Sequence, residues 1–335
     1  MILPVNLGER SYEILLRRGS LARAGEFLNL DRKVLVVTDS GVPSRYAQTV
    51  ADQAKDAVIV TFPQGEESKN VNTWMTLLDR LVSENFTRAD CVVAVGGGVV
   101  GDMSGFAAAT YLRGIDFYNI PTTLLAQIDS SVGGKVAVDY KGYKNLVGAF
   151  HQPKKVLIDP DVLQTLDRRQ VHAGAAEAVK TALIGDRELF ELFESGNALS
   201  QIETVISRSL AFKAHVVEQD EREGGLRRVL NFGHTVGHAV EKVSNFSLLH
   251  GECVALGMLP MVSESVRSRL LPVLRSLDLP TEYSGDTERI VEAMAHDKKC
   301  AGGDITVVRC ETVGSFEFRT VPFSRLADEM REVLQ

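Results

Sequence analysis

Cysteine is scarce in this sequence, and the cysteines that do occur lie far apart. The 335 residues include four cysteines, and none of them belongs to a C-x-x-C pair. A disulfide framework or a cysteine zinc knuckle needs closely and regularly spaced cysteines. Both are therefore excluded, and we expect reduced thiols in a cytoplasmic protein.

Long apolar runs and basic blocks are also missing. No apolar run approaches membrane-spanning length, and residues 1–16 have neither a basic start nor a long apolar centre, so we expect no membrane partner and no secretion signal. The net charge is −7, from 44 acidic and 37 basic residues. Without a basic cluster we expect no nucleic-acid partner, whereas small anionic substrates need only a local group of cations.

The first half of the chain alternates between apolar strands and helices. Residues 2–17 predict a β-hairpin. Further strands are expected at 33–39, 57–62 and 91–95, with helices at 45–54 and 71–85. Continuous apolar strands are typical of a parallel sheet covered on both faces, and the alternation indicates a doubly wound α/β fold. We predict a Rossmann-like domain over residues 1–160.

Helical periodicity dominates the second half. We predict a mostly α-helical domain over residues 161–335, in which 304–309 and 314–321 form a closing β-hairpin before a last helix at 324–335. The chain contains no internal repeat and no low-complexity segment.

A glycine cluster follows the strand at 91–95. Gly96, Gly98 and Gly101 satisfy the G-x-G-x-x-G spacing, in which glycines let backbone N–H groups approach a pyrophosphate at a helix N-terminus. A tight turn explains any single glycine, and an ordinary Rossmann domain has this motif after its first strand. Four glycines within 96–101 nevertheless favour nucleotide or phosphate binding.

The segment from Arg113 to Asn145 is rich in polar groups although its neighbours are apolar. A solvated loop is one interpretation of its lysines. Leu146 and Val147 closely follow Lys144, however, and predict that the lysine ammonium groups face a cleft rather than water.

Three histidines lie within residues 231–258. His234 and His238 are four residues apart on one predicted helix, and His250 begins a second helix that is too apolar to be exposed. A single histidine is more often a core or capping residue. Three on two buried helices indicate a catalytic metal site that lacks at least one ligand from elsewhere.

Eight motifs together carry a family resemblance. They are, in order, GGGVVGDMSGFAA, YLRG, PTTLLAQIDSSVGGK, KNLVGAFHQP, GAAEAVK, LNFGHTVGHAVE, HGECVALGM and DKK. Over nearly its whole length the chain resembles the 3-dehydroquinate synthase family of sugar phosphate cyclases. The resemblance implies an active site in the cleft between the two domains, and a homodimer.

The resemblance implies a metal site and a nucleotide site. Zn²⁺, with Co²⁺ as a substitute, would be held by Glu177, His234 and His250, and His238 would face the substrate. The H-x-x-x-H spacing lacks the glutamate of a zinc protease. The residues implied for catalytic NAD are Asp39, Glu66, Lys69, Gly97, Gly98, Val99, Val100, Gly101, Asp102, Thr122, Thr123, Lys135 and Lys144.

The implied reaction converts 3-deoxy-D-arabino-heptulosonate 7-phosphate to 3-dehydroquinate and phosphate, in the shikimate pathway of aromatic amino acid biosynthesis. The implied substrate residues are Arg113 (from the partner subunit), Asp129, Lys135, Lys144, Asn145, Lys180, Lys213, Arg227, Asn231, His238 and one of Lys298 and Lys299. Tyr143 departs from the glycine usual in the family, which affects the loop that carries Lys144.

Three alternatives remain at this point. A different sugar phosphate cyclase would act on sedoheptulose 7-phosphate, and a metal-dependent polyol dehydrogenase would share the fold and the cofactor. A non-catalytic NAD-binding protein would have lost a ligand or Lys180, and all of these residues are present.

Overall fold

The computed structural model describes residues 1–245, 247–295 and 303–334. The chain divides into two compact units, Met1–Leu166 and Asp167–Gln335, which are described one by one. Residues 161–166 belong with the first unit because Val162 is buried in its core and Thr165 lies 3.0 Å from the Tyr46 hydroxyl. Within the described residues, no helix has both the length and the apolar character that a membrane span requires.

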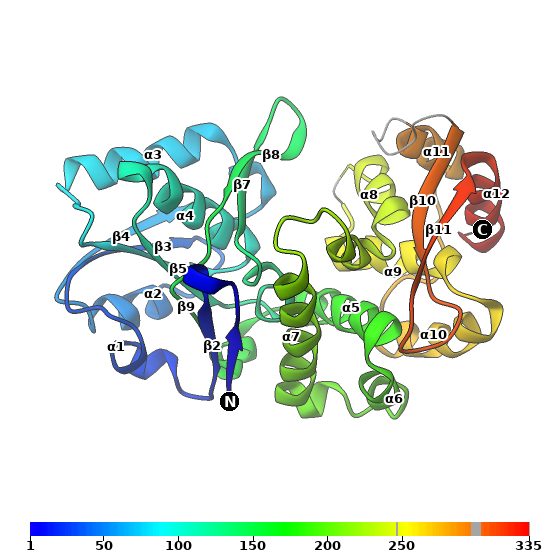
Figure 1. Ribbon diagram of the computed structural model, residues 1–335, viewed down its shortest axis with the longest axis horizontal. Helices are drawn as coiled ribbons and strands as arrows, with labels where there is room; N and C mark the ends of the chain where they lie inside the picture. The colour runs from blue at the N-terminus through cyan, green and yellow to red at the C-terminus, as the bar shows by residue number, and fades with distance from the viewer. Residues whose placement is uncertain (246, 296–302, 335) are drawn as a thin grey trace. The chain divides into compact units, whose positions relative to one another are not determined.

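The first unit is built around a mainly parallel sheet (Figure 1). In its described part, seven strands follow the order β1-β2-β9-β6-β5-β3-β4, and only β1 runs antiparallel to its neighbour. The strands are β1 (Ile2–Val5), β2 (Tyr12–Leu16), β3 (Lys33–Asp39), β4 (Asp56–Phe62), β5 (Cys91–Gly96), β6 (Asp116–Pro121) and β9 (Lys155–Ile158). The predicted hairpin and the three predicted apolar strands are confirmed.

Helices cover both faces of this sheet because its central strands are apolar on both sides. Val34 and Val36 of β3 pack with residues of α1 and α2, whereas Leu35 and Val37 pack with residues of α3 and α4. Successive side chains of a strand point to opposite faces. The helices are α1 (Ala24–Phe27), α2 (Ser44–Ala51), α3 (Val71–Ser83) and α4 (Gly98–Thr110). The predicted doubly wound, Rossmann-like fold is confirmed.

A second hairpin in this unit corrects one expectation. Its strands are β7 (Lys135–Tyr140) and β8 (Tyr143–Phe150), which pair antiparallel. Val136 of β7 lies in the core beside α4, but Leu146 and Val147 of β8 are 52% and 37% exposed. The prediction that this segment is buried and turns Lys144 away from water is wrong, because β8 meets the core only through the partly buried Ala149.

The second unit is mostly helical, as predicted (Figure 1). Its helices are α5 (Arg168–Gly185), α6 (Arg187–Glu194), α7 (Ile202–Gln219), α8 (His234–Val243), α9 (His250–Met258), α10 (Glu264–Ser276), α11 (Thr287–Ala295) and α12 (Phe323–Leu334). The predicted hairpin is formed by β10 (Asp304–Arg309) and β11 (Glu317–Pro322), and α12 is the predicted last helix.

Glycines let α9 approach its two neighbours closely. A Cβ atom on Gly251 would lie 1.8 Å from the carbonyl oxygen of Ala173 in α5, and one on Gly257 would lie 2.0 Å from the carbonyl oxygen of Gly233, just before α8. No side chain fits at either position without a backbone shift. The first turn of α9 is therefore held against α5, and the start of α8 is held against the last turn of α9.

Candidate functional site

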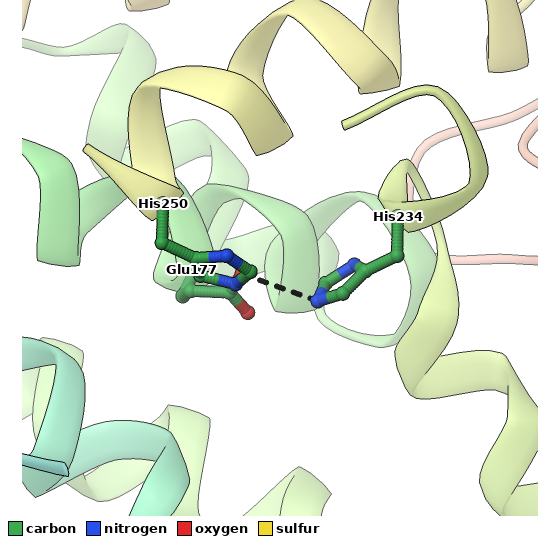
Figure 2. A group of neighbouring side chains, drawn as sticks. All are labelled: Glu177, His234 and His250. Carbon is green, nitrogen blue, oxygen red and sulfur yellow. Dashed lines mark ion pairs between the residues drawn. The ribbon is translucent and has the colours of Figure 1, made fainter. Parts of the chain in front are cut away.

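Three helices of the second unit bring Glu177, His234 and His250 to one point (Figure 2). Glu177 lies in the middle of α5, whereas His234 and His250 are the first residues of α8 and α9. Oε1 of Glu177 lies 3.8 Å from Nε2 of His234 and 3.5 Å from Nε2 of His250. Three potential ligand atoms lie within 4.8 Å of one another, which suits a divalent cation bound by two imidazoles and a carboxylate.

The ring orientation of His234 is set by the chain just before it. Nδ1 of His234 lies 3.0 Å from the carbonyl oxygen of Phe232. A carbonyl oxygen only accepts, so Nδ1 carries the proton and Nε2 keeps its lone pair. Gly233 between them has φ 76°, a left-handed conformation that glycine adopts readily. This turn leaves Nε2 available toward Glu177.

Glu177 is a buried carboxylate that suits a cation. Its side chain is 1% exposed, and Lys180 Nζ lies 2.5 Å from Oε2. Neither oxygen accepts a hydrogen bond of regular geometry within the described residues, and such a buried group needs a strong partner. Burial alone would raise the pKa of Glu177, but the charge of Lys180 and the imidazole of His250 hold that pKa well below its ordinary value.

The two imidazoles differ in protonation. Burial, reinforced by the charge of Lys180, lowers the pKa of His234 well below its ordinary value, which keeps this ring neutral as a metal ligand requires. Burial would also lower the pKa of His250, but the neighbouring carboxylates of Glu177 and Glu241 outweigh it and raise that pKa to about 9. A cation bound at Nε2 of His250 would displace this proton.

A second set of possible ligands overlaps the first. His238, Glu241 and His250 also offer ligand atoms within 4.8 Å of one another. The ring centroid of His238 lies 5.1 Å from that of His234 and 5.9 Å from that of His250. The structure therefore keeps all three histidines in one cluster, and the assignment of His238 to the substrate stays a prediction.

Three of the predicted substrate-binding cations are buried in this unit. Lys180, Lys213 and Arg227 are 2%, 7% and 3% exposed. Lys180 Nζ donates a hydrogen bond to the carbonyl oxygen of Leu230 at 2.8 Å, which ties α5 to the 3-10 helix η8 (Leu226–Asn231). This bond brings Lys180 to the residue that precedes Asn231, and the substrate roles of both residues stay predictions.

The loop before η8 contains residues that the sequence did not indicate. Asp220 accepts hydrogen bonds from the backbone N–H groups of Gly224, Gly225 and Arg227 at 2.9, 2.7 and 2.9 Å, and these bonds hold its pKa below the ordinary value. In the same loop, Glu223 accepts a hydrogen bond from the Asn231 amide at 2.7 Å. The sequence signal that could have indicated this turn is Asp220 followed, later in the same loop, by the glycine pair Gly224 and Gly225. Lys298 and Lys299 lie outside the described residues.

In the first unit, the glycine cluster lies where the strand order reverses. The chain passes from β3 outward to β4 and then returns to β5 on the other side of β3. Open parallel sheets bind ligands at such a switch point, beyond the carboxyl ends of the strands. Asp39 ends β3 and Gly96 ends β5, so both lie at this edge.

The helix after β5 begins inside the glycine cluster. α4 starts at Gly98 with Gly97 as its N-cap. Residues 98–102 therefore form the first turn of α4, whose N–H groups point toward any ligand at its end. Thr122 and Thr123 lie beside this turn: Thr122 N donates to Gly96 O at 2.9 Å, and a Cβ on Gly97 would lie 3.2 Å from Thr123.

Five of the predicted residues form a charged cluster in the same unit. Lys69 Nζ lies 2.5 Å from both Asp102 Oδ2 and Asn145 Oδ1, and Lys144 lies 3.5 Å from Glu66. Burial would lower the pKa of Lys69, but Asp102 and Glu66 outweigh it and raise that pKa. Asp139, which no sequence motif indicated, also belongs to this cluster and accepts a hydrogen bond from Asn145 N at 2.8 Å.

The remaining predicted residues of this unit are more exposed. Lys135 and Arg113 are exposed, and Asp129 is half-buried. Arg113 has φ 68° in the short 3-10 helix η4 (Tyr111–Arg113). Their roles stay predictions.

Family models and relatives match most of the chain. The model for the N-terminal part of 3-dehydroquinate synthase matches residues 59–173, and the model for the C-terminal part matches residues 174–300. The 3-dehydroquinate synthase of Acetivibrio thermocellus is 44% identical over 328 residues, which covers 91% of each chain. That of Nostoc punctiforme is 42% identical and covers 100% of this chain and 99% of the relative.

Solved structures share the fold over almost the full length. A 2-deoxy-scyllo-inosose synthase complexed with carbaglucose-6-phosphate, NAD⁺ and Co²⁺ has TM-score 0.91 and 27% identity over 100% of both chains. A 2-epi-5-epi-valiolone synthase from Streptomyces hygroscopicus with NAD⁺ and Zn²⁺ has TM-score 0.89 and 29% identity over 98% of both chains. A glycerol dehydrogenase from Schizosaccharomyces pombe, at 16% identity and TM-score 0.63 over 96% of this chain and 88% of its own, shares the fold alone.

Proposed function

The chain belongs to the 3-dehydroquinate synthase family, and from this membership we propose that it converts 3-deoxy-D-arabino-heptulosonate 7-phosphate to 3-dehydroquinate and phosphate. One observation carries the proposal: Glu177, His234 and His250, all inside the segment matched by the C-terminal family model, meet at one point. The reaction would run through oxidation by NAD, β-elimination of phosphate, reduction, ring opening and intramolecular aldol closure.

We propose that Glu177, His234 and His250 hold Zn²⁺. When bound, the ion supplies Lewis-acid polarisation of a substrate hydroxyl. The protein contributes a neutral His234 and a carboxylate that is buried beside Lys180. Two imidazoles and one carboxylate also leave positions open for substrate oxygens, as a catalytic zinc site requires.

We propose that NAD binds at the switch point of the parallel sheet. The first turn of α4 offers backbone N–H groups to the pyrophosphate, and Gly97 and Gly98 leave room for its close approach. The carboxylate of Asp39, at the end of the adjacent strand, is placed to accept a hydrogen bond from a ribose hydroxyl. Two related cyclase structures contain NAD⁺.

The substrate carries a carboxylate and a phosphate, and each needs charged donors. Lys180, Lys213 and Arg227 are buried in the second unit, and Lys180 lies beside Glu177. As the family resemblance implies, these residues would bind and orient the substrate anions, while His238 would exchange a proton with a substrate oxygen.

The purified protein, supplied with NAD and Zn²⁺, is expected to release phosphate from the heptulosonate phosphate and to form dehydroquinate. A coupled phosphate assay with product identification by mass spectrometry measures both. Sedoheptulose 7-phosphate serves as the matched substrate, because it lacks the carboxylate. Phosphate release from sedoheptulose 7-phosphate alone would identify a different sugar phosphate cyclase and contradict this assignment.

We also propose that the protein works as a homodimer in which Arg113 reaches the partner's substrate. The support is a set of exposed apolar side chains on β8 and next to Arg113 in the chain. Tyr143, Leu146 and Phe150 of β8 are 63%, 52% and 47% exposed, and Leu112 is 38% exposed. Exposed apolar residues on a strand of a two-stranded hairpin typically mark an interface.

Co-expression of two inactive variants tests this arrangement. If Arg113 acts across the interface, dimers that pair Arg113→Ala with Lys180→Ala contain one intact site, and a statistical mixture should recover about a quarter of wild-type activity. Each variant expressed alone is the control. No recovery on co-expression, with dimers present by light scattering, would show that Arg113 acts within its own subunit.

A further inference from the structure

Glu241 is a buried carboxylate beside the proposed metal ligands to which neither the motifs nor the family match gives a task. It lies in α8, one turn after His238, and is 7% exposed. Its Oε2 lies 3.7 Å from Nδ1 of His250 in α9. It thus faces the ring nitrogen that points away from Glu177, whose Oε1 lies 3.5 Å from Nε2 of the same ring.

The two nitrogens of an imidazole cannot be assigned independently. If Nε2 of His250 gives its lone pair to a cation, Nδ1 carries the proton. This N–H group then needs an acceptor for its hydrogen bond. In metal sites the second nitrogen commonly donates to a carboxylate or a backbone carbonyl, which fixes the ring orientation and makes the ligand more basic. Glu241 occupies the place of that acceptor.

His234 shows the same arrangement with a different acceptor. Its Nδ1 donates to the carbonyl oxygen of Phe232 at 3.0 Å, and its Nε2 also faces Oε1 of Glu177. Both imidazoles therefore have an oxygen beside Nδ1, at 3.0 Å for His234 and 3.7 Å for His250, and direct Nε2 toward the same carboxylate. The difference is that His250 has a charged acceptor from another helix, whereas His234 has a neutral one from its own turn.

We propose that Glu241 is the positioning residue of His250. Its carboxylate accepts a hydrogen bond from Nδ1–H of His250, and this bond holds Nε2 toward a cation that Glu177 and His234 also bind. The proposal rests on the metal site of the proposed function, but it concerns metal affinity and does not depend on which sugar phosphate is converted. Glu241 would act through His250 and would not touch the metal itself.

The structure also allows an alternative role for Glu241, as a metal ligand, which competes with the positioning role. His238, Glu241 and His250 form the second set of possible ligand atoms, so a cation bound there would make Glu241 a ligand. The competitor requires Nδ1 of His250 as a ligand atom on the Glu241 side, and it would leave the buried Glu177 paired with Lys180 but without a metal ion. The positioning role keeps both carboxylates occupied.

Zn²⁺ affinity, measured by competition with a chromophoric chelator, tests the proposal independently of activity. Glu241→Ala is expected to bind Zn²⁺ about 10- to 100-fold more weakly, the loss typical of removing such an outer partner. Glu241→Gln retains an oxygen that can accept a hydrogen bond from Nδ1–H, so this variant should keep most of the wild-type Zn²⁺ affinity. Co²⁺ spectra of the Gln variant should keep the wild-type band pattern, since the ligand atoms are unchanged.

Val240→Ala is the structural control, because Val240 is fully buried in the same helix and its truncation weakens packing without touching the ring. It should lower the melting temperature while leaving Zn²⁺ affinity close to that of the wild type. If Glu241→Gln loses zinc as completely as Glu177→Gln, Glu241 is a ligand and the positioning role is overturned. It is equally overturned if both Glu241 variants bind Zn²⁺ normally, or if Val240→Ala loses as much affinity as Glu241→Ala.

Discussion

His250→Ala is expected to abolish stoichiometric zinc binding and to lower kcat/KM by about 10³-fold or more, since Lewis-acid stabilisation is worth several kcal/mol. His250 is the residue on which the proposed site depends most. Its Nε2 lies 3.5 Å from Glu177, and it belongs to both sets of possible ligands. Metal content by plasma emission spectroscopy and steady-state kinetics with added Zn²⁺ measure the two effects.

His238→Ala is the matched control, because it removes a neighbouring imidazole from the same cluster. Its ring centroid lies 5.9 Å from that of His250, but it is absent from the ligand set that includes Glu177. This variant should keep its zinc and turn over more slowly. Equal loss of zinc in both variants would show that the metal lies between His238 and Glu241, and that the assignment of Glu177 as a ligand is wrong.

Gly251→Ala is expected to separate α5 from α9 and to lower the free energy of unfolding by about 3 kcal/mol or more, at the upper end of the range for overpacking. The new Cβ would lie 1.8 Å from the carbonyl oxygen of Ala173 and 2.9 Å from its Cα. Both are backbone atoms, so no rotamer change relieves the clash. Ala173 lies one turn before Glu177 and Gly251 follows His250, so the same movement should weaken zinc binding.

Gly224→Ala is a control with the same chemical change at an open position. A Cβ there would meet only a side-chain oxygen of Asp220, at 3.9 Å, which is ordinary contact. Urea unfolding of the wild type and both variants, with and without Zn²⁺, gives the stability difference and its metal dependence. Wild-type stability for Gly251→Ala would contradict the close approach of α5 and α9 described above.

Much of the fold was predictable because its signals are local. The runs KVLVVTD and CVVAV became β3 and β5, since apolar residues on both strand faces require helices above and below. The end of the chain likewise formed the expected hairpin and last helix. The error at β8 has a clear cause: apolar residues such as Leu146 predict burial only when another layer covers them, and which layer exists is not a local property.

The candidate site was partly predictable from the sequence. The spacing of His234 and His238 and the start of the next helix at His250 indicated a metal cluster, and Glu177 entered only through the family resemblance. Glu241 had no recognisable role, although it lies one turn from His238, because a glutamate on a helix is usually exposed. Asp139 and Glu223 were missed for a different reason, because their hydrogen-bond partners come from other segments.

The sequence by itself determined the order of strands and helices, the glycine turn at a helix start, and the family with its chemistry. These depend on periodicity and on motifs that are contiguous in the chain. Only the tertiary structure decided that Nε2 of both His234 and His250 faces the buried Glu177. It also decided that the Glu241 carboxylate lies beside Nδ1 of His250. The physical reason is that these atoms belong to separate helices, and their distances depend on how closely α5, α8 and α9 pack, which glycine positions permit and larger residues would prevent.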